Sequence, residues 1–383
     1  MSLARSLLAR AARSSHVRGL SSLASAGAAA HSTAGRMPWQ RVLTGAVALT
    51  ALATGARAAS NAAQSESTSS ASSIAASAPP ASGKVRVGLV QLSVGADKAA
   101  NLSLASERVG AAVAQGAKLV VLPEMFNCPY TNASFGPYSE SLPEVGATAA
   151  QVAAMRDSPS ARAMSALARK HGIWLVAGSM PERAAAASPA ERHPKSGLDF
   201  LLYNTALVFG PEGQVVGKHR KVHLFDIDVP GKMTFRESDT LTAGQTPTLF
   251  DTPFGRVGVG ICYDMRFGEY AALLAARGAS MLIYPGAFNT TTGPMHWELL
   301  QRARAVDNQL WVLTCSPARS ADPKAYQAWG HSSAISPWGR VVATTEHQPD
   351  VVVTEVDMSE VDEMRKNIPV RTQKRTDIYR TQE

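Results

Sequence analysis

Apolar positions along the chain switch between two patterns, one typical of buried strands and one typical of helices. Continuous apolar runs at VRVGLVQL (85–92) and AKLVVLP (117–123) predict buried strands. Between them, residues 100–115 repeat apolar positions at helical spacing and stop before Gly116, a usual helix C-cap. The alternation continues with helices at 159–171, 268–277 and 294–308 and strands at IWLVAGS (173–179), SMLIYP (280–285) and LWVLTC (310–315). Helices alternating with strands predict a mostly parallel, layered sheet.

Turn sequences interrupt this alternation and predict hairpins. GPEG (210–213), TPFG (252–255) and SPWG (336–339) are each flanked by β-branched residues. These hairpins add antiparallel pairs to the sheet. We therefore expect one α/β domain, residues 84–365, with more than one layer of sheet, and we see no internal repeat of 20 to 50 residues.

The first eighty or so residues differ in composition from the rest. They are rich in Ala and Ser and contain no acidic residue before Glu66, so residues 1–60 are predicted to be an organellar transit peptide. The stretch VLTGAVALTALATGA (42–56) is too short and too polar for a membrane span, but it fits the second half of a bipartite sorting signal ending at ARA (56–58). Residues 61–83 are predicted to be a disordered linker. We expect a mitochondrial protein, with the matrix favoured and a plastid or the cytoplasm as alternatives.

Charge and cysteine content narrow the function classes. The formal charge is +8, but residues 1–65 hold seven of the 38 basic residues, which leaves 31 basic against 30 acidic residues in the remainder. A nucleic-acid footprint would be clustered on the folded body, so we do not expect nucleic-acid binding. Three cysteines form no paired framework, which favours a reducing compartment or a catalytic thiol over disulfides.

Three reactive side chains follow apolar runs where a buried strand is expected to end. Glu124 ends LVVLPE, Lys221 lies in GKHRKVHLFD after the GPEG hairpin, and Cys262 ends RVGVGIC. Chemistry gathers at strand ends in α/β folds. A carboxylate can take the thiol proton, the thiolate can attack a carbonyl carbon, and the ammonium, with the backbone N–H of Tyr263, can stabilise the oxyanion.

Each of these residues alone also has an ordinary structural interpretation: a surface carboxylate, one of three consecutive cations, and a core thiol. His219 and His223 are four residues apart, but no carboxylate completes a zinc motif and the segment is predicted to be a strand. A Cys-His-Asn hydrolase with His296 or His331 as base stays open, without a supporting local motif. Cys128 and Cys315 are expected to pack in the core.

The motifs PEMF (123–126), HRKVHLFDIDVPG (219–231) and GICYDMRF (260–267) resemble the nitrilase, or carbon–nitrogen hydrolase, superfamily. The resemblance runs from Val85 to Tyr379 and is closest to the omega-amidase branch, through FDIDVPGKMTFRES, ICYDMRFGE, YPGAFNTTTGPMHWELLQRARAVDNQ and WGHSSAISPWG. It implies a four-layer αββα sandwich with two mixed sheets. It also implies a homodimer, with the C-terminal tail, residues 366–383, at the dimer interface.

The resemblance implies a Glu-Lys-Cys set with Glu124 as base, Lys221 as oxyanion partner and Cys262 as nucleophile. It adds Glu237, in TFRES, to hold the lysine. It also implies that Arg266 binds a substrate carboxylate, against the alternative that Arg266 pairs with Asp264 or another acid. Other pocket residues implied by the resemblance are Tyr130, Tyr263, Phe288 and Thr292.

The implied reaction is hydrolysis of the terminal amide of 2-oxoglutaramate or 2-oxosuccinamate to the 2-oxo dicarboxylate and ammonia, through a cysteine thioester. Alternatives are a deaminated-glutathione amidase, a carbamoyl-amine hydrolase, and a non-catalytic oligomeric scaffold. No cofactor or metal is expected, and no membrane span in the mature chain. The segment 182–197 is expected to be a surface insertion without a catalytic role.

Overall fold

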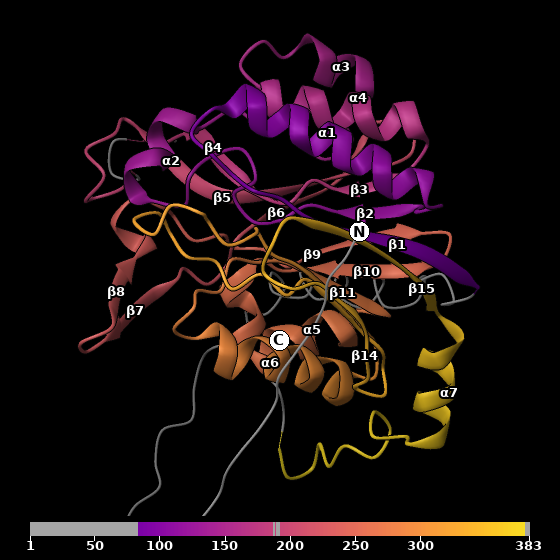
Figure 1. The fold of residues 1–383 in the computed structure, drawn as a ribbon. Coiled ribbons are helices and arrows are strands. Elements are labelled where there is room, and N and C mark those ends of the chain that lie inside the picture. Colours follow the sequence, from indigo (N-terminus) through magenta and orange to yellow (C-terminus); the bar gives the residue numbers. More distant parts are fainter. Residues whose placement is uncertain (1–82, 187, 189–191, 380–383) are drawn as a thin grey trace, which may run out of the picture. The chain divides into compact units, whose positions relative to one another are not determined.

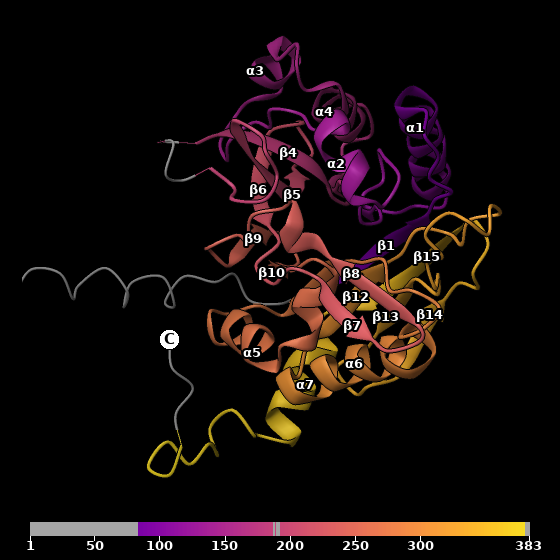
Figure 2. The same cartoon turned by 90° about the vertical axis from the view of Figure 1, so that its left-hand side faces the viewer.

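Two mixed β-sheets lie face to face between two layers of helices (Figures 1 and 2). The computed structural model describes residues 83–186, 188 and 192–379. The predicted transit peptide and almost all of the predicted linker lie outside the described residues. Within the described chain the predicted four-layer αββα sandwich is confirmed.

The first sheet has seven strands in the order β15-β1-β2-β3-β5-β4, with β6 paired to β5. Strand pairs β1–β2 and β2–β3 are parallel, whereas β15, β4, β5 and β6 make antiparallel pairs. Its strands are β1 (Lys84–Gln91), β2 (Leu119–Val121), β3 (Trp174–Val176), β4 (Met180–Ala185), β5 (Phe200–Phe209), β6 (Val215–Arg220) and β15 (Asp350–Asp357).

The second sheet has six strands in the order β14-β13-β12-β11-β10-β9, with β10, β11 and β12 parallel. The predicted hairpin turns join β5 to β6, β9 to β10 and β13 to β14. Its strands are β9 (Thr248–Thr252), β10 (Gly255–Val259), β11 (Met281–Pro285), β12 (Trp311–Cys315), β13 (Ser333–Ile335) and β14 (Val341–Thr344).

Apolar residues on both faces of the first sheet explain its continuous apolar runs. Successive residues of a strand point to opposite faces. In β2, Leu119 and Val121 face the second sheet, whereas Val120 packs with Val109 and Met164 of the covering helices. A strand buried on both faces has no polar side, so its sequence shows no alternation.

Helices α1 (Lys98–Ala114), α3 (Ala149–Ala154) and α4 (Pro159–His171) cover the first sheet, and α5 (Gly268–Ala276) and α6 (Gly293–Asn308) cover the second (Figure 1). Capping sets their limits. Asp97 accepts hydrogen bonds from the first backbone N–H groups of α1, and α4 begins at a proline and ends at Gly172 with φ of 58°.

Several short elements have no clear pattern in the sequence. Strands β7 (Asp226–Val229) and β8 (Met233–Arg236) form a separate hairpin on the side of the molecule that faces the viewer in Figure 2. Helix α2 (Asn132–Tyr138) and two 3₁₀ turns, η3 (Glu237–Asp239) and η4 (Cys262–Arg266), lie in connections. The hairpin leads directly into η3.

The expectation of a surface insertion at 182–197 is wrong for its first four residues. Strand β4 continues to Ala185 and pairs with β5 along its whole length. Glu182 is buried and accepts hydrogen bonds from Arg220, with Lys218 Nζ at 2.8 Å. These charged and alanine residues therefore belong to the sheet, because the charge of Glu182 is paired with Lys218 and Arg220.

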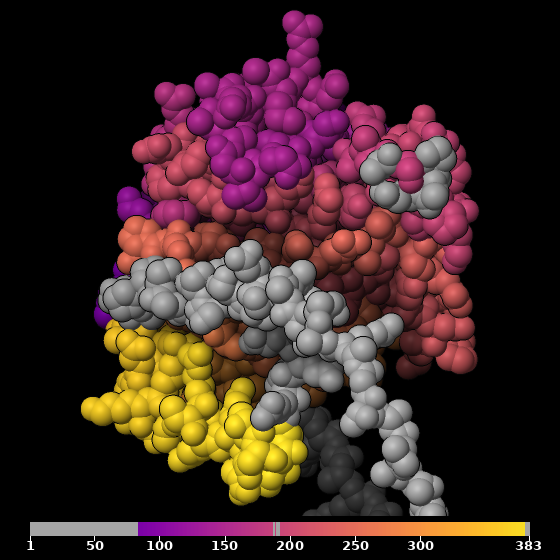
Figure 3. Space-filling view, turned by 180° about the vertical axis from the view of Figure 1, so that it is seen from behind, coloured from indigo at the N-terminus to yellow at the C-terminus, as the bar shows by residue number. Residues whose placement is uncertain are grey.

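The C-terminal segment packs on the second helical layer. Helix α7 (Ser359–Asn367) and the chain after it lie on the lower side of the molecule in Figure 3. Arg365 donates to the carbonyl of Ala279, and Arg371 donates to the carbonyl of Ala275 at the end of α5. The expectation that residues 366–383 lie at a dimer interface stays a prediction.

Candidate active site

Three strand ends bring Glu124, Lys221 and Cys262 together. Glu124 follows β2, Lys221 follows β6 directly, and Cys262 opens the turn η4 after β10. The first two strands belong to one sheet and β10 to the other, so the site lies between the two sheets. Glu124 and Lys221 are fully buried, and Cys262 is 3% exposed.

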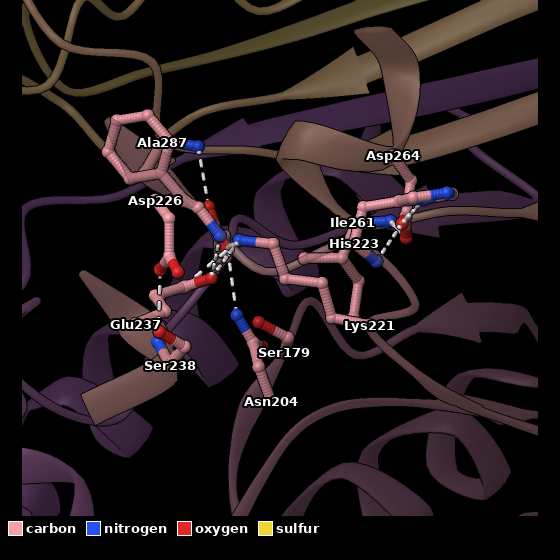
Figure 4. Close-up of polar contacts among 12 residues, drawn as sticks. Ser179, Asn204, Lys221, His223, Asp226, Glu237, Ser238, Ile261, Asp264 and Ala287 are labelled. Atoms are coloured by element: carbon pink, nitrogen blue, oxygen red, sulfur yellow. Dashed lines mark hydrogen bonds and ion pairs between the residues drawn. The ribbon is translucent and has the colours of Figure 1, made fainter. Parts of the chain in front are cut away.

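The ammonium of Lys221 lies between two carboxylates. Its Nζ is 2.9 Å from Glu124 Oε1 and 2.9 Å from Glu237 Oε2. Figure 4 shows Lys221 extending toward Glu237. Glu237 is also fully buried, and it accepts hydrogen bonds from Tyr130 Oη at 2.7 Å and from the backbone N–H of Phe225 at 2.7 Å. The structure therefore brings all four predicted catalytic side chains into one group.

Both carboxylate oxygens of Glu124 accept hydrogen bonds. Asn204 Nδ2 donates to Oε1 at 2.8 Å, beside Lys221, and the backbone N–H of Ala287 donates to Oε2 at 2.8 Å. Asn204 and Ala287 thus donate to different oxygens of this carboxylate. Gly286, the residue before Ala287, lies against Cys262, and the charge of Glu124 raises the pKa of the Cys262 thiol. Glu124 is thus fixed in orientation between the ammonium and the thiol.

The electrostatics favour a neutral thiol at rest. Burial raises the pKa of Cys262 well above its usual value, and the charge of Glu124 raises it further, while Lys221 opposes the shift. Burial also raises the pKa of Glu124, against the opposing effect of Lys221. For Lys221, burial lowers the pKa, but the charges of Glu124 and Glu237 outweigh it and raise the pKa. The lysine is therefore a permanent cation.

The backbone at Cys262 is in an unusual conformation. Its φ is +47°, a left-handed value that non-glycine residues seldom adopt. Gly286 passes so close that a Cβ added there would lie 3.2 Å from Cys262 Cα. Strained residues of this kind persist only where the surroundings hold them, and they cluster at functional sites.

A cavity of about 270 Å³ reaches the site from the Tyr130 side. Glu124, Met125 and Tyr130 form part of its wall, opposite Tyr326 and Ala328 of the loop between β12 and β13. Cys262 is not among the lining residues. The residue is almost fully buried.

Arg266 lies in an aromatic setting without an acidic partner among the described residues. Its guanidinium carbon is 4.6 Å from the ring centre of Phe288 and 5.5 Å from that of Tyr263. One Nη atom is 3.1 Å from His296 Nδ1, and the buried Nε has no hydrogen-bond partner in the described chain. The alternative pairing with Asp264 is wrong, because histidines and backbone N–H groups fill both oxygens of Asp264.

Of the other predicted pocket residues, some line the cavity and some do not. Tyr130 lines the cavity, whereas Phe288 is buried in the core beside Trp297 and beneath Arg266. Thr292 is buried in the turn before α6, where its N–H and hydroxyl bond to Asn289, and it does not line the cavity. The ring of Tyr263 packs against Phe225 and Phe267.

Some site residues have no signal in the sequence. Asn204 is in the middle of β5, and Ala287 acts through its backbone, so neither is marked by a motif. Tyr326 packs on Tyr130 with ring centres 4.6 Å apart and donates to the carbonyl of Ala287. Among the residues that the structure describes, no three His, Cys, Asp or Glu side chains are arranged to hold a metal ion.

A buried Glu-Lys-Cys group between the two sheets of an αββα sandwich defines a class of amide-cleaving hydrolases. The sequence profile described as carbon–nitrogen hydrolase matches residues 86–366, and the chain belongs to this family. It is accordingly a hydrolase that acts on carbon–nitrogen bonds.

Several relatives are named for one activity within this family. The chain is 50% identical over 300 residues to "Omega-amidase, chloroplastic" of Arabidopsis thaliana, covering 78% of this chain and 75% of the relative. It is 47% identical over 294 residues to "Omega-amidase NIT2" of Mus musculus, covering 77% and 96%. Among solved structures, Saccharomyces cerevisiae Nit3, described as a member of branch 10 of the nitrilase superfamily, matches with a TM-score of 0.66 at 41% identity, covering 78% and 100%.

Proposed function

We propose that this chain is an omega-amidase that hydrolyses the terminal amide of short 2-oxo dicarboxylic acid monoamides, such as 2-oxoglutaramate. The observation that supports it most is the Lys221 ammonium held between Glu124 and Glu237, with the Cys262 thiol close enough to Glu124 for the carboxylate charge to raise the thiol pKa. The names of the Arabidopsis and mouse relatives support the same activity.

Glu124 acts as the base in this mechanism. It takes the thiol proton as the Cys262 sulfur attacks the amide carbon, and the charge that develops on the amide oxygen is stabilised by Lys221 and by the N–H of Tyr263. The carboxylic acid of Glu124 then gives its proton to the amide nitrogen, the carbon–nitrogen bond breaks, and ammonia leaves a thioester on Cys262.

The second half of the cycle repeats these roles with water. Glu124 removes a proton from water, the hydroxide attacks the thioester carbon, and the sulfur leaves with the proton returned from Glu124. The products are the 2-oxo dicarboxylate and the resting thiol. The cavity supports this step, because Glu124 forms part of its wall and the cavity has room for small molecules beside that residue. Glu237 holds Lys221 and Tyr130 in place.

Arg266 is proposed to bind the carboxylate at the other end of the substrate. A half-buried guanidinium with an unpartnered Nε retains hydrogen-bonding capacity for an anion, and Phe288 and Tyr263 lower the local polarity. A charge-assisted pair of this kind contributes about 1.5–3 kcal/mol, or about 10- to 150-fold in binding.

The test is ammonia release from a panel of amides by the protein without its leader. We expect the highest kcat/KM with 2-oxoglutaramate, no turnover by Cys262→Ala, and a selective loss with Arg266→Ala for acidic substrates over a neutral amide such as butyramide. Preference for deaminated glutathione or a carbamoyl amine would place the enzyme elsewhere in the family. Full activity in Cys262→Ala would refute the nucleophile assignment.

A homodimer is part of the proposal. Large apolar side chains are exposed on α6 and near the β13–β14 turn: Met295, Leu299, Val306, Trp338, Val341 and Val342. A patch of this kind is typical of a protein interface. Light scattering should give twice the chain mass, and Leu299→Asp should shift the protein toward the monomer; a monomeric wild type contradicts this part.

The leader is proposed to direct import into an organelle, because residues 1–65 are basic and free of acids. The Arabidopsis relative is named chloroplastic, which keeps the plastid beside the mitochondrion as a destination. Residues 1–82 fused to a fluorescent protein should reach one of the two organelles; a diffuse cytoplasmic signal would contradict the import proposal. In the described part of the chain, no helix is long and apolar enough to cross a bilayer.

A further inference from the structure

Two histidines of the motif HRKVH have no role in the mechanism above, yet both turn to the same buried carboxylate. His219 and His223 lie on either side of Lys221 in the sequence. His219 Nε2 is 3.0 Å from Asp264 Oδ2, and His223 Nδ1 is 2.8 Å from Asp264 Oδ1. Asp264 is fully buried and comes two residues after Cys262. We call Asp264, His219 and His223 the clasp.

Backbone donors complete the surroundings of Asp264. The N–H of Ile261 donates to Oδ2 at 2.8 Å, and the N–H of His223 donates to Oδ1 at 2.8 Å. Figure 4 shows Asp264 with Ile261 and His223 around it. Burial raises the pKa of Asp264, but the hydrogen bonds from His219 and His223 outweigh it and lower the pKa. The carboxylate is therefore ionised with each oxygen shared by a ring and a backbone group.

The clasp joins the two segments that carry the reacting groups. His219 is in β6, and Lys221 and His223 come after that strand. On the other segment, Ile261 precedes Cys262 and Asp264 follows it in η4. Lys221 Nζ itself bonds only to the two glutamates in the described chain, so its bonds do not tie it to η4. The contacts of Asp264 supply that connection between the segments.

The conformation of Cys262 makes such a connection necessary. A non-glycine residue with φ of +47° costs about 1–3 kcal/mol and persists only when its surroundings hold it. The Asp264 bond to Ile261 N–H closes the turn around Cys262. On the other side, His223 stacks on Phe267 with ring centres 3.7 Å apart, and His219 Nδ1 is 3.1 Å from Thr248 Oγ1. Contacts with Phe267 and Thr248 therefore hold both imidazole rings in place beside Asp264.

We propose that Asp264 is a positioning residue which, through His219 and His223, sets the placement of the Cys262 sulfur relative to Glu124 and Lys221. It touches neither substrate nor the reacting atoms. The inference rests on the proposed function for the identity of the nucleophile. It predicts that loosening the clasp slows chemistry more than it weakens substrate binding.

The test uses histidine replacements that keep or remove one hydrogen bond. The Asn amide nitrogen occupies about the position of His Nδ1, and the Gln amide nitrogen about that of Nε2. His223→Asn and His219→Gln therefore retain the donor to Asp264, whereas His223→Ala and His219→Ala remove it. Asp264→Asn removes the charge. The matched control is Glu182→Gln, which weakens a buried ionic group bonded to Lys218 and Arg220, the neighbours of His219 in β6.

Two rates are measured for each folded variant: kcat for ammonia release, and the alkylation of Cys262 by iodoacetamide, located by peptide mapping. A displacement of about 1 Å costs about 100-fold. We expect Asp264→Asn and the two Ala variants to lose about 100-fold in kcat with KM changed less than threefold, and to alkylate at an altered rate. His223→Asn and His219→Gln should recover most of kcat, and Glu182→Gln should keep it.

Wild-type kcat in the folded Ala variants, or equal losses in the conservative and Ala variants, would overturn the proposal. If Asp264→Asn gives no soluble protein, the His223 pair decides alone, because that side chain is 27% exposed and tolerates replacement. Alkylation needs no substrate. A wild type that hydrolyses no amide would therefore refute the proposed function, while the alkylation rates would still decide the clasp.

Discussion

Removal of the Lys221 ammonium is the perturbation with the most distinctive expected result. In Lys221→Met, a side chain of similar length loses the charge that lies 2.9 Å from Glu124 and 2.9 Å from Glu237. All three groups are fully buried, so two carboxylates then face each other without a cation. Breaking a buried ion pair by removing one partner costs about 3–5 kcal/mol.

The surviving carboxylates respond by retaining a proton. Burial already raises the pKa of Glu124, and Lys221 is the main influence that opposes this shift. Without Lys221 the pKa of Glu124 rises further, so we expect this base to be protonated at neutral pH and unable to accept the thiol proton. We expect kcat at pH 7 to fall by at least about 1000-fold, since both the base and the oxyanion partner are affected.

The stability of the variant depends on pH with a definite sign. A carboxyl whose pKa is higher in the folded state than in the unfolded chain binds more protons when folded, so stability falls as pH rises between the two pKa values. Lys221→Met should therefore lose more stability relative to the wild type at pH 8 than at pH 5, by about 1.4 kcal/mol for each unit of pKa difference spanned.

The assay is thermal or denaturant unfolding at several pH values, together with ammonia release. Lys218→Met is the matched control, since Lys218 is on β6, the strand that Lys221 directly follows, and its Nζ is 2.8 Å from the buried Glu182. It should lose stability but keep kcat. A Lys221→Met variant with kcat within tenfold of the wild type, or with a stability loss independent of pH, would refute the assignment of Lys221.

Three further predictions concern neighbours of the group. Tyr130→Phe removes the 2.7 Å bond to Glu237 and should lower kcat about tenfold, measured as ammonia release; an unchanged rate would separate Tyr130 from the chemistry. Gly286→Ala places a Cβ 3.2 Å from Cys262 Cα and from Trp297, and should lower kcat while unfolding remains cooperative by circular dichroism; full activity would show that the turn adapts. Alkylation of wild-type Cys262 should keep rising above pH 9, because the pKa of its thiol is raised; a plateau near pH 7 would indicate a preformed thiolate.

The sequence predicts the regular part of the fold well. Helix α4 begins and ends where Pro159 and Gly172 indicate, and the three turn motifs join the expected strand pairs. The local backbone preferences of proline, glycine and the turn residues decide these features, so the sequence alone predicts them. The sequence pattern does not predict the hairpin β7–β8, because its two four-residue strands alternate exposed and partly buried positions and have no apolar run.

Part of the site can also be predicted from the sequence, because local patterns mark some of its residues. Glu124 and Cys262 follow apolar strands, Lys221 follows the second strand of the GPEG hairpin, and this placement at strand ends marks all three. Asn204 and Ala287 reach Glu124 only through the tertiary arrangement of β5 and the chain after β11, and no sequence pattern marks either. The sequence marks His219 and His223 only by their spacing of four residues. Their common partner, Asp264, is distant in sequence and could be identified only from the fold.

Mass spectrometry of the enzyme quenched during turnover tests the proposed chemistry most directly. We predict that wild-type protein exposed briefly to 2-oxoglutaramate carries the corresponding acyl group on the peptide that contains Cys262, and that Cys262→Ala carries none and releases no ammonia. Rapid ammonia release with no acyl group on Cys262 at any quench time, and undiminished release by Cys262→Ala, would contradict a thioester at this residue.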